Sequence, residues 1–160
     1  MDPLKLSLVA HSTHHFASPV SPEMLDRVLA LSGIERGWRV VDLGCRALLR
    51  IAGPLDVATT PALGEALQPF RGPGQQLILD LRRVEYIETP GLRLLLELNE
   101  LLQSSGGRLC LVVQPGSRVD RTLRLIDFDR PGPLLASVRE AWSGPAGPGG
   151  SAPRDRRQAA

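Results

Sequence analysis

Short apolar runs alternate with helical periods along the chain. Three runs have the length of strands and consist mainly of Leu, Ile, Val and Ala; they cover residues 47–53 (ALLRIAG), 76–81 (QLILDL) and 108–113 (RLCLVV). We expect Gly53-Pro54 to end the first strand. Strands that alternate with crossovers of this length favour an α/β fold with parallel neighbours in the sheet.

Helix-start signals lie between these strands. Thr60 is the expected N-cap in the segment 59–70, with Pro61 at the first helical position. A second helix over residues 92–103 follows the turn at 88–91. Thr89 is its expected N-cap and Pro90 its first helical residue, where a fixed φ suits the helix and a missing N–H is not needed. The solvent side of this helix should carry Arg93, Glu97 and Glu100.

The last part of the folded region is predicted to form two short helices and an edge strand. Ser117 opens the first helix, and Ser137 and Glu140 form a capping box at the start of the second, over residues 137–142. A short edge strand is predicted near Leu134. The inward positions of the first helix should be Val119, Leu123 and Ile126.

Composition favours a soluble protein without a metal or cofactor. Hydrophobic residues make up 42% of the chain and charged residues 22%, and the net charge is +2 without a cationic block in the body, which argues against nucleic-acid binding. No apolar run is long enough to cross a membrane. Cys45 and Cys110 lie far apart, as in reduced cytoplasmic proteins, and the histidines at 11, 14 and 15 lack partners at zinc-ligand spacing.

Three regions follow from these patterns. Residues 1–37 are predicted to be a leader with an amphipathic helix, and residues 38–142 a single folded domain. Residues 143–160 contain almost no large apolar side chain and many Gly and Pro. They cannot bury enough surface to offset the entropy of ordering, so we predict a disordered tail.

The stretches LRIAGPLDVATTPALGEAL and LILDLRRVEYIETPGLRLLLELNELL resemble the STAS domain of bacterial anti-sigma factor antagonists. The resemblance covers residues 40–142, and its most specific parts are the Gly-x-Leu-Asp at 53–56 and Gly91-Leu92. It implies a mixed sheet of four to five strands packed against about four helices. It also implies a non-catalytic function, in which the domain binds an anti-sigma factor, usually a protein of kinase fold.

In the family that this sequence resembles, the turn reads Asp-Ser-Ser-Gly-Leu, and the kinase phosphorylates the second serine to abolish binding. Glu88 takes the place of the aspartate, Thr89 of the first serine and Pro90 of the acceptor. Because proline has no hydroxyl, the usual phosphoacceptor is absent at Pro90. Thr89 is the alternative acceptor. We therefore expect a binder that is insensitive to phosphorylation.

The resemblance places the partner-binding surface around this turn and the exposed face of the second helix. No small-molecule substrate is expected there. Asp80, Glu85 and Glu88 have no nucleophile at readable spacing, so we expect a solvated rim rather than an acid–base pair. We expect Asp56 to act as a turn or cap residue. The expected surface residues are Glu88, Thr89, Pro90, Gly91 and Arg93, with Asp56 and Thr59 beside them.

Residues 16–45 resemble the entry of a class I S-adenosylmethionine-dependent methyltransferase. Asp42, Gly44 and Cys45 match the start of its Asp-x-Gly-x-Gly loop, but Arg46 replaces the second glycine, and too little chain remains for the rest of a Rossmann sheet. We therefore expect WRVVDL to serve as the first strand of the folded domain, hairpinning through GCR. The residues expected to pack there are Val40, Val41 and Leu43, with Leu25 and Leu29 on the added helix.

Three alternatives remain open at this level. The domain could be the accessory subunit of a lipid-transport ATPase complex, as in other STAS relatives. A degenerate methyltransferase is the enzymatic alternative. Within the leader, residues 1–37 could be only loosely attached.

Overall fold

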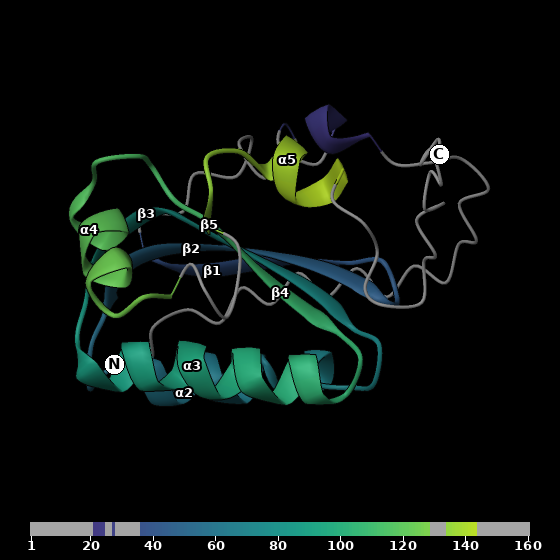
Figure 1. Ribbon diagram of the computed structural model, residues 1–160, viewed down its shortest axis with the longest axis horizontal. Coiled ribbons are helices and arrows are strands. Elements are labelled where there is room, and N and C mark those ends of the chain that lie inside the picture. The colour runs from purple at the N-terminus through teal and green to yellow at the C-terminus, as the bar shows by residue number, and fades with distance from the viewer. Residues whose placement is uncertain (1–20, 25–26, 28–35, 129–133, 144–160) are drawn as a thin grey trace, which may run out of the picture.

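A mixed sheet of five strands forms the centre of the domain (Figure 1). In the computed structural model, which describes residues 21–24, 27, 36–128 and 134–143, β1 is antiparallel to β2 and all other neighbours are parallel. The strands lie in chain order and are β1 (Gly37–Asp42), β2 (Arg46–Leu55), β3 (Gln76–Ile87), β4 (Arg108–Val112) and β5 (Leu134–Leu135).

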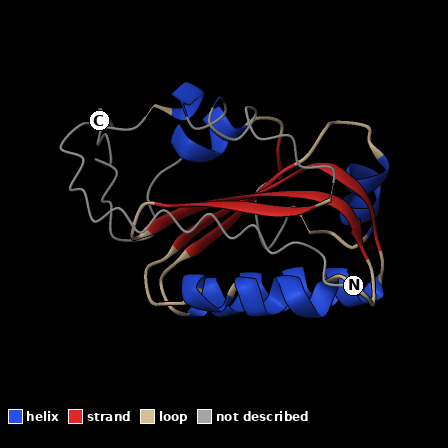
Figure 2. Ribbon diagram, turned by 180° about the vertical axis from the view of Figure 1, so that it is seen from behind, coloured by secondary structure: helices blue, strands red, loops and turns tan. Residues whose placement is uncertain are grey.

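Helices cover both faces of this sheet (Figures 1 and 2). α2 and α3 lie against one face, α5 lies against the other, and α4 lies at one end. A short 3-10 helix, η1, follows α2. The bounds are α2 (Thr60–Ala66), η1 (Gln68–Phe70), α3 (Thr89–Ser104), α4 (Arg118–Leu125) and α5 (Val138–Ser143). This architecture confirms the predicted α/β fold with a mixed sheet.

Successive side chains along each strand point to opposite faces of the sheet, and they form two cores, one on each side. Leu77 and Leu79 of β3 pack in the larger core under α2 and α3, whereas Ile78 packs in the smaller core under α5. The smaller core is closed at its edge by Trp142, whose ring lies 5.1 Å from the guanidinium carbon of Arg46. Because β3 is buried on both faces, the apolar run Leu77–Leu79 follows the buried Gln76 without a polar residue up to Asp80.

The β1–β2 hairpin predicted from WRVVDL and GCR is confirmed. Gly44, with φ 82°, lies in its turn and donates its N–H to the Asp42 carboxylate at 2.9 Å. Val40 packs against the larger core and Val41 against the smaller one. The expectation for Leu43 was wrong, because this side chain lies in the turn and is exposed.

Several predicted boundaries were wrong by one or a few residues. β2 does not end at Gly53-Pro54, because Gly53 takes φ 90° and a register shift against β3 lets the strand bend and continue to Leu55. α2 and α3, the helices that follow the two long strands, each begin one residue earlier than predicted. Thr59 and Glu88 occupy their N-cap positions. Neither residue caps its helix with a side-chain hydrogen bond.

The later elements follow the prediction, with one exception. The Ser117 hydroxyl accepts the Asp120 N–H at 3.1 Å and so caps α4 as expected, and β5 is the predicted edge strand. Ile126 does not face inward but is exposed, because α4 ends at Leu125 and the chain turns away at Asp127, which has φ 54°.

The predictions for the two ends of the chain fall mostly on residues outside the described ones. These include Leu25 and Leu29 of the predicted amphipathic helix, most of the leader and residues 144–160 of the tail. Within the described residues, Met24 is exposed, and the Glu23 carboxylate lies 3.7 Å from the Arg139 guanidinium.

Candidate functional site

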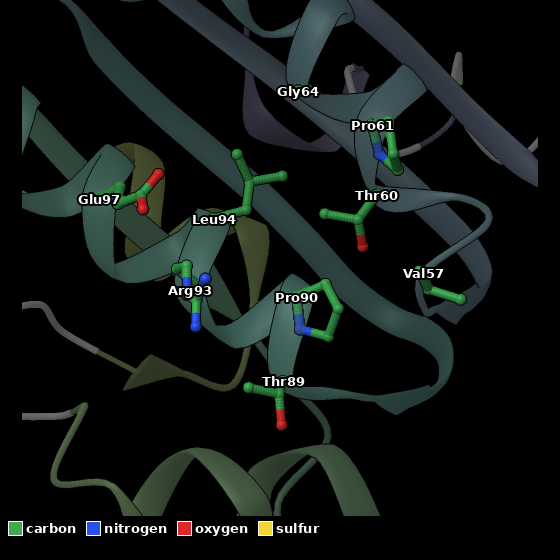
Figure 3. A pocket seen from close by; sticks show the side chains of 9 residues that line it. All are labelled: Val57, Thr60, Pro61, Gly64, Thr89, Pro90, Arg93, Leu94 and Glu97. Carbon is green, nitrogen blue, oxygen red and sulfur yellow. The ribbon is translucent and has the colours of Figure 1, made fainter.

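A shallow open groove of about 400 Å³ separates the start of α2 from the first two turns of α3 (Figure 3). The β2–α2 loop contributes Val57, which is 72% exposed. The groove is predominantly apolar, with charged side chains along α3 only. Its lining residues are Val57, Thr60, Pro61 and Gly64 on one side and Thr89, Pro90, Arg93, Leu94 and Glu97 on the other.

The start of α3 is fixed to the sheet through Glu88. Its backbone is extended, its N–H donates to the Leu55 carbonyl at 2.9 Å, and its carbonyl accepts the Leu92 N–H at 3.0 Å. Thr89 is therefore the first helical residue and Pro90 the second, and the helix loses nothing through a proline there. Thr89 is exposed and Pro90 is half-buried at the groove.

The β2–α2 loop is shaped by the Asp56 carboxylate. Its Oδ1 accepts the N–H groups of Ala58 and Thr59, each at 2.9 Å, which confirms the predicted turn role. The Thr59 N–H is the main cause that lowers the pKa of Asp56, partial burial acts in the opposite direction, and the Ala58 N–H lowers it further. The Thr59 hydroxyl donates to the Pro54 carbonyl at 2.7 Å. Asp56 and Thr59 thus hold the loop that carries Val57.

Gly91 lies beneath the groove rather than on its surface. It is buried, and a Cβ at this position would come within 2.9 Å of Ile87 Cγ2 and 3.0 Å of the Leu55 Cβ and carbonyl oxygen. Gly91 therefore lets α3 approach the ends of β2 and β3 closely. This packing role explains why residue 91 is a glycine. Glu88, three positions earlier, is exposed at the surface.

Two opposite charges border the groove on α3. Arg93 and Glu97 are both exposed and lie one helical turn apart, in agreement with the predicted solvent side of this helix. Figure 3 shows both side chains extending from α3 beside Leu94. Within the part of the chain that the structure describes, no ion pair joins these two residues. Glu100, the next acidic residue on this side, does not line the groove.

Six residues that line the groove were not among the expected surface residues; they are Val57, Thr60, Pro61, Gly64, Leu94 and Glu97. Thr60 was assigned as a cap but is buried as the first residue of α2. Gly64 lies inside α2, and a Cβ there would meet only Leu94 Cδ1 at 3.7 Å. A glycine within a helical pattern was the available signal for Gly64, because it lowers helix stability and is therefore unusual inside a helix. No comparable signal exists for Thr60.

A second polar cluster, on the face of the sheet that α5 covers, is structural. Asp80 is 1% exposed and accepts from Arg50 Nε at 2.8 Å and from Arg82 Nε and Nη2 at 2.9 Å each. Burial acts to raise the pKa of Asp80, but the hydrogen bonds and charge of Arg82, with Arg50, outweigh it and hold the pKa below its usual range. The prediction of a solvated rim was therefore wrong for Asp80, because strand pairing places it directly opposite Arg50.

The described residues contain no group of three or more His, Cys, Asp or Glu side chains that could hold a metal ion. Across the same ranges, no helix is both long enough and apolar enough to span a membrane. Cys110 is buried, and burial raises the pKa of its thiol, against the opposing effect of Arg108. The Asp42–Cys45 segment, which resembles a cofactor loop in sequence, is the turn of the β1–β2 hairpin.

The five-stranded mixed sheet with helices on both faces defines an α/β module, and comparison with known families identifies it. Residues 40–141 match the STAS domain, and the chain belongs to the STAS family. No curated protein matches the sequence.

Solved structures agree with this assignment. An anti-sigma factor antagonist from Mycobacterium paratuberculosis is 27% identical, with a TM-score of 0.59 over 66% of this chain and 90% of that one. A Thermotoga maritima protein is 24% identical, with a TM-score of 0.57 over 67% and 91% of the two chains. The antagonist SpoIIAA in its unphosphorylated form is 20% identical, with a TM-score of 0.52 over 66% and 94%. The last two support the fold alone.

Proposed function

We propose that this STAS domain is an anti-sigma factor antagonist that binds an anti-sigma factor of kinase fold in the cytoplasm through the groove between α2 and α3. The observation that carries the proposal is the groove itself. An apolar depression lies at the start of α3, bordered by Arg93 and Glu97. Interfaces of this kind combine an apolar centre with a polar rim. The 27% identical mycobacterial structure, described as an anti-sigma factor antagonist, supports the same class of partner.

The proposal includes insensitivity to phosphorylation. Pro90 occupies the position that aligns with the acceptor serine in the family motif, and a proline ring offers no oxygen for phosphoryl transfer. Thr89 is exposed but precedes that position by one residue, and a helix rotates by about 100° per residue. Its hydroxyl is therefore directed differently from one at residue 90. Binding is then controlled by the abundance of the domain rather than by a phosphate at the mouth of α3.

The binding test uses purified kinase-fold anti-sigma factors encoded by the same organism, each titrated against the full chain by calorimetry. At least one should bind. Reversing a border charge with Arg93→Glu or Glu97→Lys should weaken that complex about tenfold, or about 1.4 kcal/mol. Glu100→Lys is the matched control, because it makes the same change on the same helix outside the groove. Failure of every anti-sigma factor to bind, or equal weakening by the control, contradicts the proposal.

The phosphorylation test incubates the bound anti-sigma factor and the chain with Mg-ATP and measures the intact mass. We expect no added phosphate and an unchanged dissociation constant. One phosphate on Thr89 together with loss of binding would show that the neighbouring hydroxyl has taken over the regulatory role, and insensitivity to phosphorylation would be refuted.

A further inference from the structure

The hydroxyl of Thr60 is the one polar feature of the groove floor that the fold leaves unexplained. Thr60 is 8% exposed, and its Oγ1 is shielded from solvent and has no hydrogen-bond partner among the described residues. The preceding residue is different, because the Thr59 hydroxyl donates to the Pro54 carbonyl at 2.7 Å. The backbone N–H of Thr60 is also satisfied, by the Asp56 carbonyl at 3.0 Å.

A buried hydroxyl without a partner destabilises the free domain, because the group loses its hydrogen bonds to water and gains none in return. Valine has nearly the same shape and would fill the same space without this loss. The surrounding groove surface is apolar, formed by Val57, Pro61 and Pro90. Packing therefore accounts for a β-branched side chain at residue 60 but not for its oxygen.

The hydroxyl can reach the groove without any movement of the backbone. In Figure 3 the Thr60 side chain lies between Pro61 and Pro90, and its oxygen is directed toward the side of the groove where Pro90 lies. Threonine in a helix uses two χ1 rotamers, and rotation about this bond moves the oxygen to a new position without moving the backbone. A polar atom entering the groove can therefore meet the hydroxyl.

We propose that Thr60 is a specificity-determining residue of this surface, whose hydroxyl forms a hydrogen bond with an uncharged amide or hydroxyl group on a side chain that the anti-sigma factor inserts between α2 and α3. The occupant has an apolar stem because the walls are apolar. Its tip is uncharged because Arg93 and Glu97 on the border cancel each other and no charged residue lines the floor. This inference rests on the proposed function and adds the chemistry of the inserted group.

Thr60→Val tests the inference because it separates stability from binding. In the free domain the variant should melt a few degrees higher than the wild type, since an unpartnered buried hydroxyl has been removed. The anti-sigma factor that binds the wild type should bind the variant about tenfold more weakly. Thr60→Ser retains the hydroxyl and should keep the affinity within about threefold.

Thr122→Val on α4 is the matched control, because its hydroxyl donates to the Arg118 carbonyl at 2.9 Å away from the groove. It should leave binding unchanged. If the wild type binds and Thr60→Val binds equally well, the role of Thr60 is refuted and the proposed function stands. A lower melting temperature for Thr60→Val also refutes it, since the hydroxyl would then have an internal partner. Failure of all anti-sigma factors to bind the wild type overturns both.

Discussion

Replacing Gly91 by alanine tests whether this motif glycine acts through packing. The new Cβ would lie 2.9 Å from Ile87 Cγ2 and 3.0 Å from the Leu55 Cβ and carbonyl oxygen, so α3 must move away from the sheet. Overpacking of this kind costs about 1–3 kcal/mol. The higher helix propensity of alanine returns about 0.5–1 kcal/mol. We therefore expect the free energy of unfolding to fall by about 1–2 kcal/mol.

Gly64→Ala is the matched control for this change. It places the same methyl group in the neighbouring helix, where the only contact is Leu94 Cδ1 at the ordinary distance of 3.7 Å. This variant should be more stable than the wild type by about 0.5–1 kcal/mol. The two alanine substitutions are therefore predicted to have opposite signs.

Urea unfolding, followed by circular dichroism, measures both variants. With a slope of about 2 kcal/mol per molar urea, a loss of about 1–2 kcal/mol lowers the midpoint of Gly91→Ala by roughly 0.5–1 M with the slope unchanged. A Gly91→Ala midpoint equal to or above that of the wild type would refute the packing argument.

Three further predictions concern other parts of the domain. Asp80→Asn should lower the free energy of unfolding by about 3 kcal/mol, because it removes a buried charge shared by Arg50 and Arg82. The folded-state pKa of Asp80 lies below the ordinary 3.8. The difference in unfolding free energy between wild type and variant, measured with urea, should therefore be complete above pH 3.8 and shrink as the pH falls below it. A difference that does not change with pH would contradict this. Pro90→Ser should gain one phosphate from the anti-sigma kinase and Mg-ATP and then lose binding, whereas Pro90→Ala should gain none in the same mass measurement. Ser117→Ala should lower the thermal unfolding free energy by about 1 kcal/mol through loss of its bond to the Asp120 N–H, whereas glycine should lower it by only a few tenths.

The strands and helices could be predicted because their signals are local. The apolar run at 76–81 and the Ser117 cap are each defined by a few neighbouring residues. β3 and α4 both begin where these signals predict. The predicted strand ended at Leu81, because the charged pair Arg82-Arg83 interrupts the apolar run. β3 nevertheless continues to Ile87, because the neighbouring β2 continues beside it to Leu55.

The charge cluster and the groove could not be predicted, because both depend on contacts between distant residues. Asp80 resembles a solvent-facing carboxylate until β2 and β3 pair and place it opposite Arg50, thirty positions earlier. Thr60 resembles an N-cap until α2 begins one residue earlier and places its shielded hydroxyl on the groove floor. A shift of one position thus changes a cap into a groove residue, and helix boundaries are the least certain part of a sequence-based prediction.

Under the proposed function, the start of α3 explains how regulation and folding can be separated in this domain. The junction is held by the backbone of Glu88, which bonds to the Leu55 carbonyl on one side and the Leu92 N–H on the other, and by the absence of a side chain at Gly91. Residue 90 contributes neither a backbone donor nor a packing contact that only one side chain could supply, because the second position of a helix has no intrahelical use for its N–H. Serine and proline therefore satisfy the same fold at residue 90. Under the proposed function, exchange between them changes whether a kinase finds an acceptor, and it replaces the proline ring in the groove wall while the junction of α3 stays intact.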